Sequence, residues 1–315
     1  MAANANLHKA KNAKNDEFYT QLTDVSKELM HYKQHFKDKI VFCNCDDPTW
    51  SAFWKYFHLN FSALGLKKLI STHYDKTEPT YKMEYTGGDD NDIEVGVKTP
   101  LEGNGDFRNQ ECLDLLDESD IVVTNPPFSL FREYVACLME HEKKFLIIGN
   151  MNAIKYKEIF PLMKDNKIWA GFKSFSGGMN MIQPKYSFDI SKTKSYTIDE
   201  NGNIVKNIMG VIWFTNLDIR KRHEKLILWK NYTPEEFPTY DDYNAIEVGK
   251  VSDIPCDYDG VIGVPITFFD KYCPEQFEII GELNNGGDNE WDFAKPKING
   301  KQKYSRILIR KKVGA

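Results

Sequence analysis

One four-residue segment, Asn125-Pro126-Pro127-Phe128, has the residue types and spacing of a site that handles a planar amine. Two consecutive prolines fix φ and remove two N–H donors, so the turn holds its carbonyls in one direction, free to accept hydrogen bonds. The side-chain oxygen of Asn125 beside the Pro126 carbonyl makes two acceptors, which an –NH2 group needs if its nitrogen is to become tetrahedral and nucleophilic. Phe128 offers a face for a flat base, worth about 1–3 kcal/mol. The alternative is a tight strand-to-helix turn without chemistry.

Short apolar runs around this segment predict the strands of an α/β sheet. Runs typical of strands buried on both faces lie at residues 40–43, 121–124, 145–148 and 211–215, and further strands are expected at 68–72 and 167–172. Helical periodicity alternates with strands over residues 38–218, which indicates a doubly wound, mostly parallel, Rossmann-like sheet. Such sheets bind ligands beyond the carboxyl ends of their strands, where the Asn-Pro-Pro-Phe segment would lie.

A helix is predicted after the first strand, because apolar residues recur three and four positions apart from Trp50 to Leu64. Asp47 suits its N-cap, Pro48 its first helical position and Gly65 its end. Other helices are expected at residues 21–36, after a Ser129 cap and from Pro274, and further strands at 93–98 and 261–269.

The composition limits the class of protein. The 315 residues are 41% hydrophobic, which is enough for a sizeable core. The formal net charge of -5 counts mildly against a nucleic-acid partner, although basic clusters at 8–14, 220–225 and 306–312 could face phosphates locally. The six cysteines form no CxxC pair, so no metal site is expected. No apolar stretch reaches about 18 residues, which favours a cytoplasmic protein without membrane segments.

The Asn-Pro-Pro-Phe segment resembles the catalytic motif of amino-methyltransferases that use S-adenosylmethionine (AdoMet). From about Leu7 to Lys311 the chain looks like the EcoRI-type adenine-specific DNA methyltransferases. The likeness rests on residues 15–21, 43–48, 105–108, 120–132 and 263–269. It implies site-specific methylation of adenine N6 in double-stranded DNA, by a monomer of bacterial or phage origin paired with a restriction endonuclease.

The resemblance assigns the catalytic roles to four residues. Asn125 and the Pro126 carbonyl would accept from the adenine amine, and Pro127 would hold the turn rigid. Phe128 would stack on the target base, which must leave the duplex to present N6 to the methyl group.

The cofactor residues follow the same likeness. Tyr19 and Thr20 would line the methionine end of AdoMet, with a helix-capping role open for Thr20. The turn Cys45-Asp46-Asp47-Pro48 would meet the ammonium group, with Asp46 the better ligand because Asp47 could be a plain N-cap. This turn departs from the common pattern, since no glycine occurs before Gly65.

The adenine end of the cofactor is expected at the next motif. Asp106 would accept from the cofactor's adenine amine and Phe107 would offer a ring for its face, the alternative being an ordinary Gly-Asp turn. Asp75 is the nearest acid for the ribose hydroxyls.

DNA contacts are expected from basic side chains beside these motifs and in the densest basic run. These are Arg108, Arg132, Arg220, Lys221 and Arg222, although Arg132 could equally pair with an acid. The predicted organisation is a mobile arm (1–16), an AdoMet-binding catalytic domain (17–218) and a smaller, irregular target-recognition region (219–315). Residues 173–209 form an expected DNA-contacting insertion.

Two alternatives remain open from the sequence. Similar motifs serve enzymes that methylate RNA bases or protein glutamine. The glycine-poor cofactor turn would also suit a DNA-binding relative that has lost catalysis.

Overall fold

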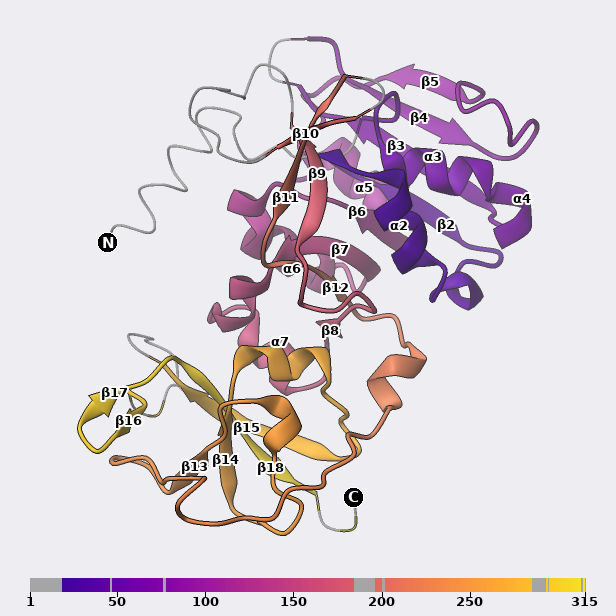
Figure 1. The fold of residues 1–315 in the computed structure, drawn as a ribbon. Coiled ribbons are helices and arrows are strands. Elements are labelled where there is room, and N and C mark those ends of the chain that lie inside the picture. The colour runs from indigo at the N-terminus through magenta and orange to yellow at the C-terminus, as the bar shows by residue number, and fades with distance from the viewer. Residues whose placement is uncertain are drawn as a thin grey trace. The chain divides into compact units, whose positions relative to one another are not determined.

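The computed structural model describes residues 19–45, 47–75, 78–183, 196–199, 202–284, 293, 295–312 and 314. The expected N-terminal arm and Asp46 lie outside these residues. The chain divides into two compact units (Figure 1). The first consists of Met1–Tyr156 with Gly171–Leu217, and the second of Lys157–Ala170 with Asp218–Ala315.

A large mixed sheet forms the centre of the first unit, in the strand order β5-β4-β3-β2-β6-β7-β12 (Figure 1). The bounds are β2 (Ile40–Cys43), β3 (Lys68–His73), β4 (Tyr81–Tyr85), β5 (Val97–Pro100), β6 (Ile121–Thr124), β7 (Lys144–Asn150) and β12 (Val211–Thr215). Strands β3, β2, β6 and β7 are mutually parallel, whereas β4, β5 and β12 pair antiparallel. The α/β prediction is therefore confirmed, with a sheet more mixed than expected. Strand β4 was not predicted, and β5 begins at Val97 rather than residue 93.

The order of this sheet reverses at β2. The chain passes from β2 to β3 on one side, and β6 pairs with β2 on the other, in the register Val41↔Ile121. All residues of β2 and β6 are buried, so the two strands form the centre of the core. The loops after β2 and β6 therefore leave the same edge of the sheet side by side.

Helices connect and flank the strands of this unit. They are α2 (Leu22–Leu29), α3 (Ala52–Leu59), α4 (Phe61–Leu64), α5 (Gln110–Glu118) and α6 (Phe131–Glu140), with the 3-10 turns η1 (Lys33–His35), η2 (Phe128–Leu130) and η3 (Met151–Lys155). Gly65 ends α4 in the left-handed conformation, with a φ of 65°, as predicted.

Two predicted helix starts are wrong. Helix α3 begins at Ala52, because the hydroxyl of Ser51 accepts from the N–H groups of Phe53 and Trp54 and so provides the N-cap. Asp47 and Pro48 lie before this cap, and Trp50, expected in the buried stripe, is 69% exposed. Ser129 lies inside η2 and does not cap α6.

A second sheet of the first unit combines β1 with strands of the expected insertion (173–209). Its strands are ordered β1-β9-β11-β10, with bounds β1 (Tyr19–Thr20), β9 (Met179–Gln183), β10 (Thr197–Ile198) and β11 (Ile204–Ile208). The buried carboxylate of Glu28 on α2 anchors the start of this segment, because it accepts from the N–H groups of Phe172 and Lys173. The described residues of the insertion thus contribute the strands β9, β10 and β11.

The second unit contains the sheet β13-β14-β18-β15 and helix α7 (Phe160–Lys164), which contacts β15. The strands are β8 (Trp169–Ala170), β13 (Ala245–Glu247), β14 (Val261–Val264), β15 (Phe277–Leu283), β16 (Lys297–Ile298), β17 (Lys301–Gln302) and β18 (Arg306–Lys311), with 3-10 turns η6 (Arg220–His223), η7 (Val251–Asp253) and η8 (Ile266–Asp270). The helix predicted from Pro274 is wrong, because the segment that follows forms β15 against β18. The predicted 261–269 strand stops at Val264, before Pro265 and η8.

Every helix in the part of the chain that the structure describes is too short or too polar to cross a membrane.

Candidate active site

Hydrogen bonds join the loops that follow β2 and β6. The hydroxyl of Thr124, the last residue of β6, donates to the backbone carbonyl of Asn44, and the hydroxyl of Thr72 on β3 donates to the side-chain oxygen of Asn44 at 3.2 Å. Both threonines are fully buried. Asn44 therefore ties three adjacent parallel strands together at their carboxyl ends, directly beside Asn125.

The Asn-Pro-Pro-Phe turn (residues 125–128) lies at this edge. Pro126 is buried, and Asn125 and Phe128 are half-buried. The Pro127 carbonyl accepts from the Leu130 N–H at 2.9 Å and closes η2. The Pro126 carbonyl accepts no hydrogen bond from the residues that the structure describes.

The turn after β2 contains no glycine, and a cysteine adopts the backbone conformation that glycine usually supplies. Cys45 has a φ of 64°, the left-handed conformation that glycine usually supplies. Its thiol lies 3.5 Å from the side-chain oxygen of Asn44, and Pro48 is buried. A tight turn therefore forms here without the common glycine pattern. Asp46, the expected ligand of the cofactor ammonium, is not among the described residues.

Asp47 is held by β3 and β4. Its Oδ1 accepts from the Tyr81 hydroxyl at 2.8 Å and from the Thr49 N–H at 2.9 Å, and its Oδ2 lies 3.1 Å from Nδ1 of His73. Burial alone would raise the pKa of Asp47, but the hydrogen bonds from His73, Thr49 and Tyr81 outweigh it and lower the pKa to about 2. His73 and Tyr81 lie 26 and 34 residues away in the chain, so sequence reasoning missed them.

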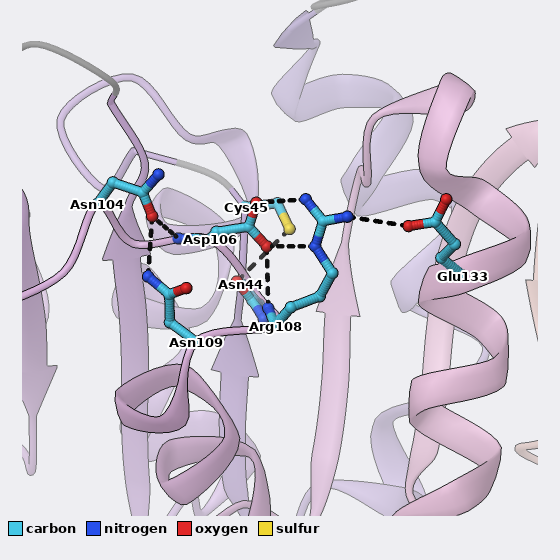
Figure 2. Close-up of polar contacts among 7 residues, drawn as sticks. All are labelled: Asn44, Cys45, Asn104, Asp106, Arg108, Asn109 and Glu133. Atoms are coloured by element: carbon cyan, nitrogen blue, oxygen red, sulfur yellow. Dashed lines mark hydrogen bonds and ion pairs between the residues drawn. The ribbon is translucent and has the colours of Figure 1, made fainter.

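Asp106 and Arg108 form a close pair, shown in Figure 2. The guanidinium donates through Nε to Oδ1 at 2.8 Å and through Nη2 to Oδ2 at 2.7 Å. Its Nη1 also donates to Glu133 on α6 at 3.0 Å. The Asp106 N–H donates to the side chain of Asn104 at 3.2 Å. The expected cofactor acid and the expected phosphate contact are therefore bonded to one another.

Phe107 and Gly105 also hold the loop around Asp106 in place. The Phe107 ring is only 3% exposed and meets Tyr134 of α6 edge-to-face, with centroids 4.9 Å apart. Burial raises the pKa of the Tyr134 hydroxyl, and the neighbouring thiol of Cys45 raises it further. Gly105 has a φ of 73°, and a Cβ there would lie 2.3 Å from the carbonyl of His73. The loop around Asp106 is thus packed against both α6 and the end of β3.

Tyr19 and Thr20 form β1, which pairs antiparallel with β9 in the register Thr20↔Met181. Thr20 is 6% exposed, and its hydroxyl oxygen has no hydrogen-bond partner within the described ranges. Residues 15–18 of the expected cofactor motif (15–21) lie outside those ranges. The structure therefore describes only the last residues of this motif.

The residues expected to contact DNA fall into two groups. Arg132 is exposed, with its guanidinium carbon 5.2 Å from the ring centroid of Tyr156, and the Arg220 side chain is 95% exposed. Lys221 instead pairs with Asp270 at 2.6 Å, and the largely buried Arg222 lies over the Trp169 ring at 4.0 Å. Arg220 is therefore the member of this three-residue run that reaches solvent.

The fold and site define the class of protein. A mixed α/β sheet carries a proline turn at its carboxyl edge, and a hydrogen bond links this turn to the turn after the neighbouring strand, which is where α/β sheets bind their ligands.

Comparisons with known proteins identify the family. The sequence model of the family "Adenine-specific methyltransferase EcoRI" matches residues 6–312. The chain is 48% identical to "Type II methyltransferase M.EcoRI" of Escherichia coli, over 99% of this chain and 98% of the relative. It is 36% identical to "Type II methyltransferase M.MpnI" of Mycoplasma pneumoniae and 37% identical to "Type II methyltransferase M.MgeORF184P" of Mycoplasma genitalium, each over 97% of this chain and 98% of the relative. No solved structure matches the chain.

The chain therefore belongs to the EcoRI family of adenine-specific methyltransferases, as the sequence resemblance predicted.

Proposed function

We propose that this enzyme transfers a methyl group from AdoMet to the N6 amine of an adenine in double-stranded DNA. The observation that carries the proposal is the hydrogen bond from Thr124 to the Asn44 carbonyl. It joins the turn that would meet the cofactor to the turn that would hold the amine. Since the strand order reverses between these two turns, a crevice for a ligand is expected there.

The residues at this edge fit AdoMet by their chemistry. AdoMet carries an ammonium group, ribose hydroxyls and an adenine amine, all of which bond well to carboxylates and carbonyls. Asp75 and Asp106 lie on loops that are joined by a hydrogen bond from the Asp75 N–H to the Asn104 carbonyl, 3.2 Å long. When bound, AdoMet supplies an electrophilic methyl group. Asp47 already accepts from four donors of His73, Thr49 and Tyr81.

The Asn-Pro-Pro-Phe turn would orient the amine. Asn125 and the Pro126 carbonyl each accept one amine hydrogen, so the nitrogen lone pair points at the methyl carbon. AdoMet would supply the methyl carbon as the electrophile and a neutral thioether as the leaving group. The nitrogen, now cationic, then loses a proton to water. The rate comes from positioning and from fixed dipoles, and no residue with an unusual pKa is required.

The target base would be extruded from the duplex to reach this turn. Phe128, half-buried at the start of η2, would stack on the flipped adenine. The finer arrangement that we propose is a doubly wound catalytic domain (17–218). The C-terminal region (219–315) would read the target sequence, and the β9–β11 segment (173–209) would contact DNA. The enzyme would act as a monomer, paired with a restriction endonuclease.

The proposal is tested with labelled AdoMet offered to duplex DNA, RNA and protein extract. Label is expected in DNA, at adenine N6. The variant Asn125→Ala should lose at least about a hundredfold in kcat while AdoMet and DNA still bind. Asn91→Ala, which removes an exposed amide elsewhere in the same unit, serves as the matched control and should retain activity.

Three outcomes would contradict the proposal. Label in RNA or protein but not in DNA would overturn the substrate assignment. Full activity of Asn125→Ala would remove its role. No AdoMet binding at millimolar concentration would favour a DNA-binding relative without catalysis.

A further inference from the structure

The guanidinium of Arg108 connects two elements that the reaction requires. Figure 2 shows it between Asp106, in the loop that precedes α5, and Glu133 on α6. Helix α6 directly follows η2 and therefore continues from the Asn-Pro-Pro-Phe turn. One side chain thus bonds the loop expected at the cofactor adenine to the helix that carries the catalytic turn.

The contact with Asp106 is the tighter of the two. Three donors of Arg108 reach one carboxylate: Nε and the backbone N–H reach Oδ1, and Nη2 reaches Oδ2. A bidentate arginine–carboxylate pair fixes both the position and the plane of the carboxylate. The Asp106 side chain is 14% exposed, whereas those of Arg108 and Glu133 are 48% and 55% exposed. The carboxylate is therefore set in a single orientation at the wall of the site.

A buried contact runs parallel to this exposed one. Phe107 packs on Tyr134, and these residues are the direct sequence neighbours of Arg108 and Glu133. The guanidinium carbon also lies 5.2 Å from the Phe107 ring centroid. Loop and helix are thus joined by one apolar and one charged contact, and movement of either element would disturb both.

We propose that Arg108 is a positioning residue of the cofactor site, which orients the Asp106 carboxylate toward the adenine amine of AdoMet and couples that loop to α6. This inference rests on the proposed function. It replaces the expectation that Arg108 contacts a DNA phosphate, because all three side-chain nitrogens of its fork already donate to carboxylates. A phosphate contact would have to displace one of these pairs.

The test compares AdoMet affinity and steady-state kinetics of the wild type with Arg108→Ala, Arg108→Lys and Glu133→Gln. Both Arg108 variants should raise the Kd and KM for AdoMet about tenfold, which is about 1.4 kcal/mol, with kcat changed less than about twofold. Arg108→Lys should not restore AdoMet affinity, because lysine keeps the charge but cannot form the bidentate pair. Glu133→Gln should have a smaller effect, because the Asp106 pair stays intact.

Two controls separate this role from others. Lys39→Ala removes an ion pair with Asp120 at the opposite edge of the same sheet, and it should leave AdoMet affinity unchanged. The slope of log K against log salt for DNA binding should be the same in wild type and Arg108→Ala. A lost phosphate contact would reduce that slope by about 0.9.

Each contrary result has a definite meaning. Unchanged AdoMet affinity in Arg108→Ala, full rescue by Arg108→Lys, or a reduced salt slope with unchanged AdoMet KM would overturn this inference alone. A wild-type enzyme that fails to bind AdoMet would overturn the proposed function and this inference with it.

Discussion

Nδ1 of His73 lies 3.1 Å from Oδ2 of Asp47, so an ion pair joins the end of β3 to the segment that follows β2. Both side chains are about four-fifths buried. The hydrogen bond to Asp47 raises the pKa of His73 above its ordinary value, burial opposes the rise, and Lys98 also opposes it slightly. The pair thus holds the turn that follows β2 through a titratable group.

The pair predicts how stability depends on pH. Because the pKa of His73 is raised, its contribution is full below the ordinary histidine value near 6.5 and is lost as pH rises through the folded-state pKa. Because the pKa of Asp47 is lowered to about 2, its contribution is present above the ordinary value near 3.9 and is lost as pH falls toward 2. In urea unfolding, the free energy of unfolding of the wild type should be lower at pH 8 than at pH 5, and His73→Gln should lack this difference. An equal pH dependence in both proteins would contradict the assignment.

Phe128→Ala should impair transfer through lost stacking. Removal of about 1–3 kcal/mol of base stacking should lower kcat/KM about ten- to a hundredfold. Fluorescence of 2-aminopurine at the target position should report less base extrusion. Phe128→Tyr retains a ring and serves as the control. An Ala variant with wild-type kinetics and wild-type fluorescence would show that the ring does not hold the base.

Gly105→Ala should destabilise the fold and weaken AdoMet binding. At φ 73° any side chain is strained, and the added Cβ would lie 2.3 Å from the His73 carbonyl. We expect a loss of about 1–3 kcal/mol. Gly210→Ala is the matched control, because Gly210 has a φ of 74° with open space around its Cβ. Equal losses in the two variants, measured by chemical denaturation, would mean that the close approach to His73 has no effect.

Alanine substitutions of Arg220 and Arg222 should have different effects on stability and DNA binding, although the two residues are only two positions apart. Arg220→Ala should leave stability unchanged and reduce the salt slope of DNA binding by about 0.9, because its side chain is 95% exposed. Arg222→Ala should lower the free energy of unfolding by about 1–3 kcal/mol, because its side chain donates to Asn166 and lies over Trp169. If Arg222→Ala instead weakened DNA binding without loss of stability, the assignment would be reversed.

The sequence alone predicted strands, a helix end and a motif, because these features depend on residues that are close together in the chain. Apolar runs predicted β2, β6 and β12 with the bounds that they have in the structure, because strands buried on both faces need uninterrupted apolar residues. Gly65 marked a helix end because only glycine adopts the left-handed conformation without strain. The Asn-Pro-Pro-Phe motif was recognised from the identity and spacing of its residues, and the family was predicted from this and similar motifs.

Only the tertiary structure decided which parts meet. The placement of β2 between β3 and β6, and with it the Asn44 link to Thr124, depends on strand pairing between residues about 80 positions apart. The partners of Asp47 and Arg108 come from other strands and helices, and β15 forms where local pattern suggested a helix. The physical reason is that periodicity and propensity act within a few residues, whereas pairing, burial and charge neutralisation are settled by whatever the folded chain brings alongside.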